Sequence, residues 1–170
     1  MESRDANLNN RYLPVLKSMQ EKLHRASRYV LADAYFAKNN FVTGLQELEF
    51  NPVSRFRDDA ALYYPKLQKP TSEKGRPKLY DGKIDMDNPD TTGVQKINID
   101  NGDLYTLAAY SKSLKQMVRL VIRYSKEGKK PKLFFSADPK MSGKDVIAYY
   151  RTRFQIGFCF RDAKSFTALM

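Results

Sequence analysis

The chain has 170 residues, a length that suits one domain or one domain with an insertion. Lysine and arginine number 30 against 19 aspartates and glutamates, and the formal charge of +11 favours a polyanionic partner, with nucleic acid ahead of a membrane surface. One cysteine and one histidine exclude an internal disulfide and a zinc cluster, and no apolar run is long enough for a membrane-spanning helix.

The first 26 residues predict a tail followed by one helix. Residues 1–9 are polar and predict a loose tail, and Pro14 suits the first turn of a helix. Apolar residues then recur at helical spacing with basic residues between them, at Val15, Leu16, Met19, Leu23 and Ala26. His24 has no metal-ligand partner nearby in the sequence, so we expect a surface or capping role for it.

Residues 29–56 predict a strand, a helix and a second strand. The strands are Tyr29–Ala32 and Asn51–Phe56, and the helix carries one apolar face from Phe41 to Leu48. Such a unit has parallel strands, and functional groups gather at the carboxyl ends of parallel strands. Asp33 follows the first strand, where it is either a cap or a functional carboxylate, and Arg55 lies near the end of the second.

Residues 58–92 predict a basic loop, because prolines alternate with lysines and arginines there. Arg76 and Lys78 belong to its most basic part. The loop is either a solvated insertion or an arm that contacts phosphate. A run of aspartates follows, but its glycine and glutamate do not fit the spacing of a calcium loop.

Residues 94–136 predict antiparallel strands, and a long helix follows them. The expected strands are 94–99, 104–110, 117–124 and 132–136, with a hairpin turn at Asn101-Gly102. Asp138 is expected to be a turn residue, and Ser142 is a predicted N-cap of the helix.

The helix that contains residues 149–164 carries the most specific pattern of the chain. At about 100° per residue, Tyr150, Arg153, Gly157 and Lys164 fall within roughly 60° of each other on one face. An apolar stripe that we expect to be buried lies beside this face, at Tyr149, Ile156, Phe160 and Ala163.

This spacing resembles the signature of bacterial insertion-sequence transposases of the DDE type, in which Tyr, Arg, Glu and Lys are separated by two, three and six residues. Tyr150, Arg153 and Lys164 match it, and Gly157 stands at the position of the glutamate. The residues around Asp33 and Arg55 are similar to the block of this family that holds its second catalytic aspartate. The resemblance implies that Asp33 is a metal-binding carboxylate, and that Arg55, Arg76, Lys78, Tyr150, Arg153 and Lys164 contact DNA or phosphate.

The resemblance also implies a fold, a cofactor and a partner. The fold would be an α/β, partial ribonuclease H-like fold with an inserted antiparallel β-subdomain. Two ions of Mg²⁺, or Mn²⁺, would be held between three carboxylates for in-line attack on phosphorus. Only Asp33 of these acids is recognisable, since about 30 residues without a β run precede it and Gly157 replaces the third. Binding of the metal by this chain is therefore in question.

We accordingly predict three regions: 1–60 with the first helix and the parallel unit, 61–137 with the basic loop and the β-subdomain, and 138–170 with the signature helix. The predicted function is that of a transposase-derived protein that binds transposon-end DNA, is truncated, and is incompetent in catalysis alone. The alternative is a non-catalytic module that pairs with an intact transposase or inhibits it. The strand at Tyr29–Ala32 should expose an unpaired edge, which favours self-association or pairing with the missing N-terminal part. We expect a cytoplasmic, nucleoid-associated bacterial protein.

Overall fold

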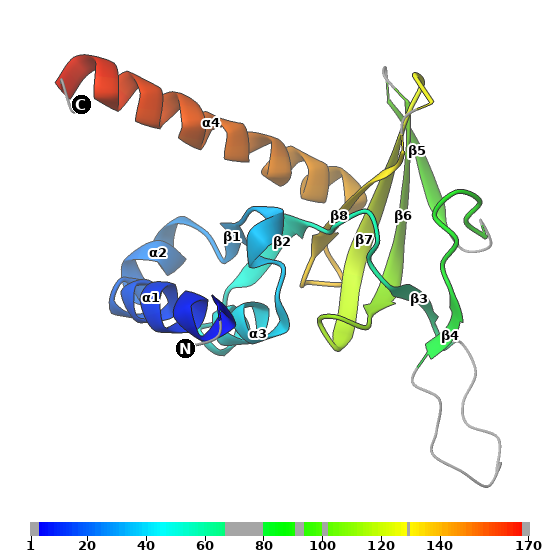
Figure 1. Cartoon of the computed structure of the whole chain (residues 1–170), viewed down its shortest axis with the longest axis horizontal. Coiled ribbons are helices and arrows are strands. Elements are labelled where there is room, and N and C mark those ends of the chain that lie inside the picture. Colours follow the sequence, from blue (N-terminus) through cyan, green and yellow to red (C-terminus); the bar gives the residue numbers. More distant parts are fainter. Residues whose placement is uncertain (1–3, 67–79, 91–93, 100–101, 129, 168–170) are drawn as a thin grey trace, which may run out of the picture.

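The computed structural model describes residues 4–66, 80–90, 94–99, 102–128 and 130–167, with side chains described between residues 11 and 155 (Figure 1). The helices are α1 (Arg4–Ser18), α2 (Gln20–Ala26), the 3₁₀ turn η1 (Ala34–Phe36), α3 (Asn39–Glu47) and α4 (Gly143–Thr167). The strands are β1 (Tyr29–Leu31), β2 (Asn51–Arg55), β3 (Leu62–Pro65), β4 (Tyr80–Lys83), β5 (Gln95–Ile99), β6 (Gly102–Ser111), β7 (Gln116–Ser125) and β8 (Lys132–Ser136).

One eight-stranded sheet contains all these strands. Its order is β1-β2-β8-β7-β6-β3-β4, and β5 pairs with β6. Strands β1 and β2 are parallel, with Leu31 opposite Val53, and the other pairs are antiparallel. The predicted α/β fold class and the predicted parallel unit are therefore confirmed. The antiparallel strands continue the same sheet, since β8 pairs directly with β2.

Apolar clusters lie on both faces of the sheet. On one face, α1, α2 and α3 cover β1 and β2 around Phe41, Leu45 and Phe50. Farther along the sheet, a larger cluster includes Val118 and Leu120 of β7 with Phe135 of β8. The long hairpin of β6 and β7 supplies much of this core because alternate side chains of both strands point into it.

Helix α4 crosses the opposite face. Its first two turns pack Val146, Ile147 and Tyr150 against Val53 of β2, Leu104 of β6, Val121 of β7 and Phe134 of β8. Gly143 permits the close approach, because a Cβ atom there would lie 2.6 Å from Cβ of Thr106. Farther along, the helix extends past the edge of the sheet (Figure 1).

Hydrogen bonds fix where α4 begins. The Ser142 hydroxyl accepts from the backbone N–H of Asp145 at 3.1 Å and donates to its carboxylate at 2.7 Å. This bond satisfies a free N–H group of the first turn, and the carboxylate favours the positive end of the helix dipole. The predicted N-cap role of Ser142 is confirmed.

Two expectations about the chain before and after the parallel unit are wrong. The region predicted as a tail is helical from Arg4, and Pro14 lies inside α1 rather than in its first turn. Packing outweighs the helix-breaking tendency of proline here, since Leu13 and Leu16 contact the cluster around Phe41. The region predicted as a loop contains β3 and β4, because Leu62 is fully buried and pairs with Ser111 of β6.

Of the two roles expected for His24, surface or capping, the structure shows capping of α3. Its Nε2 atom lies 3.0 Å from the carbonyl oxygen of Leu48, the residue that ends α3. Its ring packs against Phe50 with 4.4 Å between centroids. The contact therefore fixes α2 against the end of α3.

Strand β1 is an edge strand, as predicted, because it pairs only with β2 among the described residues. Among the same residues, no helix is long and apolar enough to cross a membrane.

The docking of α4 leads to a stability prediction. We expect Gly143→Ala to lower the free energy of unfolding, because the new methyl group collides with Thr106. The cost should be about 1–3 kcal/mol by urea denaturation. Gly82→Ala is the control, since a Cβ there meets no atom within 4 Å. Equal stability of the two variants would contradict this packing.

Candidate nucleic-acid interface

The carboxylate of Asp33 lies at the carboxyl end of β1. One of its oxygens accepts a hydrogen bond from the backbone N–H of Ala34 at 2.7 Å and so caps η1. The other accepts from Nη1 of Arg153 on α4 at 3.3 Å. The Asp33 side chain is 57% exposed and that of Arg153 is 26% exposed. Asp33 and the helix that carries Gly157, which the family resemblance assigned to one site, therefore meet at Arg153.

A buried serine fixes the backbone of Asp33 to the neighbouring strand. The Ser54 hydroxyl of β2 donates to the carbonyl oxygen of Asp33 at 3.1 Å, and Ser54 is only 1% exposed. The backbone N–H of Ala32 bonds to the carbonyl of Val53 at 3.0 Å. The sheet therefore positions Asp33 by its main chain and leaves the carboxylate accessible.

Arg55 ends the adjacent strand, two residues beyond the Leu31–Val53 pair. It lies opposite Phe134 of β8, so the two side chains share the face that α4 crosses. Its guanidinium pairs with Asp58 at 3.2 Å, and its buried Nε has no hydrogen-bond partner in the described part of the chain. Asp33, Arg55 and Arg153 therefore lie around one end of the parallel strand pair.

Tyr150 positions Arg153. Its side chain is 7% exposed and meets Phe134 edge to face, with 4.9 Å between ring centroids. The guanidinium carbon of Arg153 lies 5.3 Å from the Tyr150 ring centroid and 4.9 Å from that of Phe154. These contacts restrict the rotamers of Arg153, whose buried Nε also finds no partner among the side chains that the structure describes.

The expectation that Tyr149 is buried is wrong. Tyr149 is 37% exposed, whereas its neighbour Tyr150 belongs to the core. Helical periodicity identified the two faces of α4 but not which face meets the sheet. The Tyr149 ring instead packs against Tyr29 of β1, with 5.2 Å between centroids.

Asp138 has the predicted turn role and also joins the start of α4 to β1. Its carboxylate accepts the backbone N–H of Lys140 at 2.9 Å and the hydroxyl of Tyr29 at 3.0 Å. Burial, followed by the bond to Asp138, raises the pKa of Tyr29, so its hydroxyl stays protonated and remains a donor at neutral pH.

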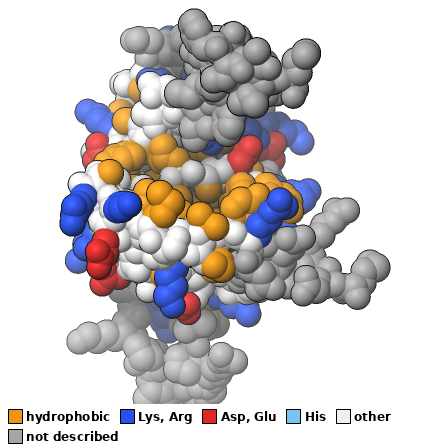
Figure 2. Space-filling model, turned by 90° about the vertical axis from the view of Figure 1, so that its left-hand side faces the viewer, with side chains coloured by type: hydrophobic (Ala, Val, Ile, Leu, Met, Phe, Trp, Pro, Cys, Tyr) orange, Lys and Arg blue, Asp and Glu red, His pale blue; other side chains and the backbone are white. Residues whose placement is uncertain are grey.

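An apolar groove of about 690 Å³ lies beside the free edge of β1. Apolar side chains of α1, β1 and η1 line it, with Arg11, Asp33 and Arg153 among its polar residues. Figure 2 shows hydrophobic side chains gathered across this side of the molecule. On α1, Tyr12 is 42% and Val15 is 56% exposed beside this groove. Sequence analysis included Val15 in the apolar stripe of the helix but missed Tyr12, because the helix was expected to begin at Pro14.

Four residues that were predicted to be functional have no described side chain. Gly157 and Lys164 lie within α4 beyond the residues with described side chains. Arg76 and Lys78 lie between residues 67 and 79, outside the described residues.

Comparison with known protein families shows to which family the chain belongs. The DDE superfamily endonuclease family matches residues 6–115, which is 110 of 170 residues. The chain belongs to the DDE superfamily of endonucleases. No curated protein and no solved structure shows a significant match to it.

The DDE match includes Asp33 and Arg55 and ends before α4. The mixed α/β sheet is consistent with a partial ribonuclease H-like DDE domain, and the family implies a DNA substrate. The insertion-sequence signature of α4 lies outside the matched residues, so it remains a resemblance.

DDE nucleases typically use divalent metals, but the described residues do not fit such a site. No group of three or more His, Cys, Asp or Glu side chains gathers among the described residues. The Asp33 carboxylate faces the guanidinium of Arg153, a cation that repels a metal ion there. Asp33, the predicted metal ligand, therefore lacks further acidic ligands among the described residues.

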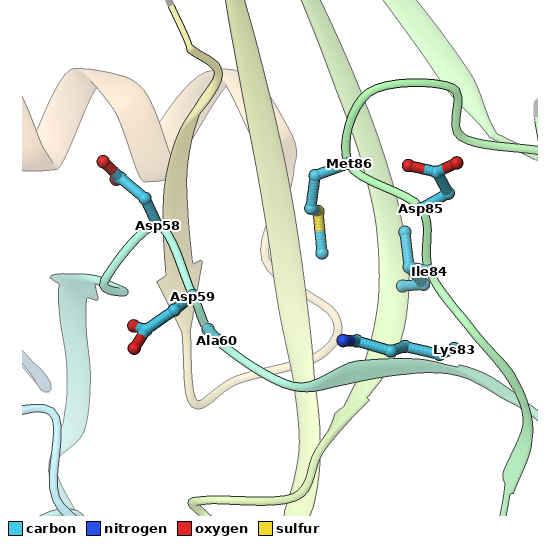
Figure 3. A pocket seen from close by; sticks show the side chains of 7 residues that line it. All are labelled: Asp58, Asp59, Ala60, Lys83, Ile84, Asp85 and Met86. Atoms are coloured by element: carbon cyan, nitrogen blue, oxygen red, sulfur yellow. The ribbon is translucent and has the colours of Figure 1, made fainter.

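A second pocket contains three further carboxylates, and their local contacts show why they do not take the place of the two family acids that were not recognised in the sequence. It has a volume of about 310 Å³, and Figure 3 shows the carboxylates of Asp58 and Asp59 on one side and Asp85 on the other. Asp58 pairs with Arg55 and Asp59 with Arg57. Asp85 accepts backbone N–H groups of the following turn. Each carboxylate is therefore engaged locally.

The packing of Tyr150 leads to the next prediction. We expect Tyr150→Ala to lower the free energy of unfolding by about 3 kcal/mol, because it removes a buried ring from the α4–sheet contact. Tyr150→Phe should change it by less than about 1 kcal/mol, since the hydroxyl bonds to none of the described residues. Urea denaturation followed by circular dichroism measures both values. A large loss with Tyr150→Phe would contradict a packing role.

Proposed function

We propose that this DDE-family chain is a transposase-derived domain that binds DNA at the carboxyl ends of β1 and β2. The observation that supports this most is the contact of Arg153 with Asp33, because it joins a helix and a strand that are 120 positions apart. Arg55 adds a second guanidinium on the same side of the sheet. Two guanidinium groups, each paired with one exposed acid, form a surface on which a phosphate backbone can take the place of the acids.

The chemistry of binding follows from the guanidinium groups. Arginine donates two parallel hydrogen bonds to phosphate oxygens, and its charge displaces counterions from the DNA. Arg55 and Arg153 already have ordered stems, so little side-chain entropy is lost on binding. Arg76, Lys78 and Lys164 would add contacts to DNA or phosphate, as the insertion-sequence resemblance implies, while Tyr150 would hold Arg153 in place.

We also propose that the 170-residue chain does not cleave DNA alone. Two-metal phosphoryl transfer needs several carboxylates around the ions. Of the three family positions, this sequence supplies Asp33 and has Gly157 where the third acid would be. A second polypeptide would have to bring the other carboxylates to Asp33, and the free edge of β1 is where its strands would pair.

The second candidate function is a non-catalytic module that pairs with an intact transposase and inhibits it. The free edge of β1 and the apolar groove beside it favour this reading. Both features offer an added strand backbone hydrogen bonds and apolar contacts. Association that grows with concentration in sedimentation, together with salt-dependent DNA binding, would favour the module over a nuclease.

The DNA-binding proposal predicts selective effects of arginine substitutions. Arg55→Gln and Arg153→Gln should each weaken duplex DNA binding about tenfold at moderate salt, through loss of a charge-assisted contact. Each should also reduce the slope of log K against log salt concentration by about 0.9. Fluorescence anisotropy over a salt series measures both quantities.

Arg28→Gln is the matched control. Arg28 precedes β1 and pairs with Glu49 at 2.6 Å, so it lies at the opposite ends of the same two strands. Its loss should change DNA affinity by less than about twofold. Equal weakening by all three variants would indicate unspecific attraction to a basic protein and would contradict the proposed site.

The proposal also predicts the outcome of a cleavage assay. Supercoiled plasmid and transposon-end duplexes should remain intact with the purified chain and Mg²⁺ or Mn²⁺, because Gly157 supplies no metal ligand. Agarose and denaturing gels detect nicks and breaks. Efficient cleavage that Asp33→Asn abolishes would overturn the claim that the chain is incompetent alone.

A further inference from the structure

A third pocket opens at the carboxyl ends of β1 and β2, and its lining begins one residue after Asp33 and one residue after Arg55 along the chain. Its volume is about 550 Å³, within the usual range for small-molecule sites. Two segments supply most of its lining, namely η1 with the residues that follow it and the loop after β2, and Ser113 between β6 and β7 completes it. Both segments leave the parallel strands at the end where Asp33 and Arg55 lie. The family resemblance and the motifs assign no role to this pocket.

Tyr35 is the prominent side chain of this pocket. Tyr35 lies two residues after Asp33, and its side chain is 54% exposed although it is a large ring. Phe36 meets it edge to face, with 5.5 Å between centroids, and Nζ of Lys38 lies 4.9 Å from its centroid. The ring therefore has ordered neighbours and still presents surface to solvent.

The other walls suit a flat group. Phe56 is buried at this pocket. The lining also includes four alanines from the two segments, namely Ala34, Ala37, Ala60 and Ala61. Small side chains leave space beside an aromatic ring without filling it. Polar groups are present as well, namely the Ser113 side chain and the exposed Arg57–Asp59 ion pair. A flat, partly polar ligand with hydrogen-bonding edges fits this combination.

We propose that the Tyr35 pocket binds an unpaired nucleobase of the DNA whose phosphates meet Arg55 and Arg153, with the base stacked on Tyr35. The inference rests on the proposed DNA-binding function and adds a preference for single-stranded or unpaired DNA. A paired base inside a duplex cannot enter, because its edges and faces are already occupied. Stacking on aromatic side chains tolerates every base, so the pocket confers strand-state preference rather than sequence specificity.

The test compares binding of short oligothymidine, blunt duplex and an abasic oligonucleotide of equal length. We expect Tyr35→Ala to weaken oligothymidine binding about 5- to 100-fold, in line with the loss of base stacking. Duplex affinity should change less than about twofold, because its phosphates still reach the arginines. On the abasic strand, the wild type and Tyr35→Ala should bind equally.

Two variants control for the ring and for folding. Tyr35→Phe keeps the aromatic face and should bind oligothymidine as the wild type does. Tyr63→Ala removes a tyrosine from β3, toward the opposite end of the sheet, and should leave the preference for single strands unchanged. Circular dichroism verifies that each variant is folded.

The results separate this inference from the function on which it rests. DNA binding that depends on Arg55 and Arg153 but is unaffected by Tyr35→Ala would overturn the base pocket alone. An abasic strand that is weakened as much as oligothymidine by Tyr35→Ala would overturn it too. Absence of DNA binding by the folded wild-type protein would overturn both proposals.

Discussion

The packing of α4 across the sheet is the contact on which the candidate site depends. Gly143 lets the helix start close to Thr106, and the Tyr150 ring meets Phe134 one and a half to two turns later. Arg153 then lies over the end of β1, where it reaches Asp33. An exposed ion pair of this kind contributes only about 0.2–1 kcal/mol to stability, so apolar packing determines the geometry and the ion pair follows from it.

This geometry bears on the role that the family resemblance implied for Asp33. In a two-metal site the carboxylate would face metal ions that further acids also bind. Here the side chain that contacts Asp33 is the guanidinium of Arg153. In the proposed function, the same guanidinium turns to a phosphate when DNA binds. The acid would then restrain the arginine in the free protein, and a bound polyanion would compete with the acid. The proposed base pocket at Tyr35 lies beside the same strand ends.

The sequence predicted the parts that depend on local pattern. Short apolar runs marked β1 and β2, and Ser142 marked the start of α4. It failed where distant packing decides. The helix before Pro14 forms because Leu13 and Leu16 pack against the α3 cluster, and β3 forms because Leu62 is buried beside β6. Family resemblance assigned Asp33 and the α4 helix to one site, but the contact of Asp33 with Arg153 was seen only in the structure, since no local period joins positions 120 residues apart. Periodicity likewise did not show that Tyr150 rather than Tyr149 is buried, because the sheet on which α4 packs is distant in the sequence.

A double-mutant cycle on DNA affinity tests the central claim most directly, using Asp33→Asn, Arg153→Gln and the variant with both changes. If Asp33 restrains Arg153 at a phosphate site, removing the carboxylate should tighten duplex binding severalfold in the wild-type background. The gain should largely disappear when Arg153 is replaced. Equal gains in both backgrounds, or no gain in either, would contradict a coupled pair at the DNA surface.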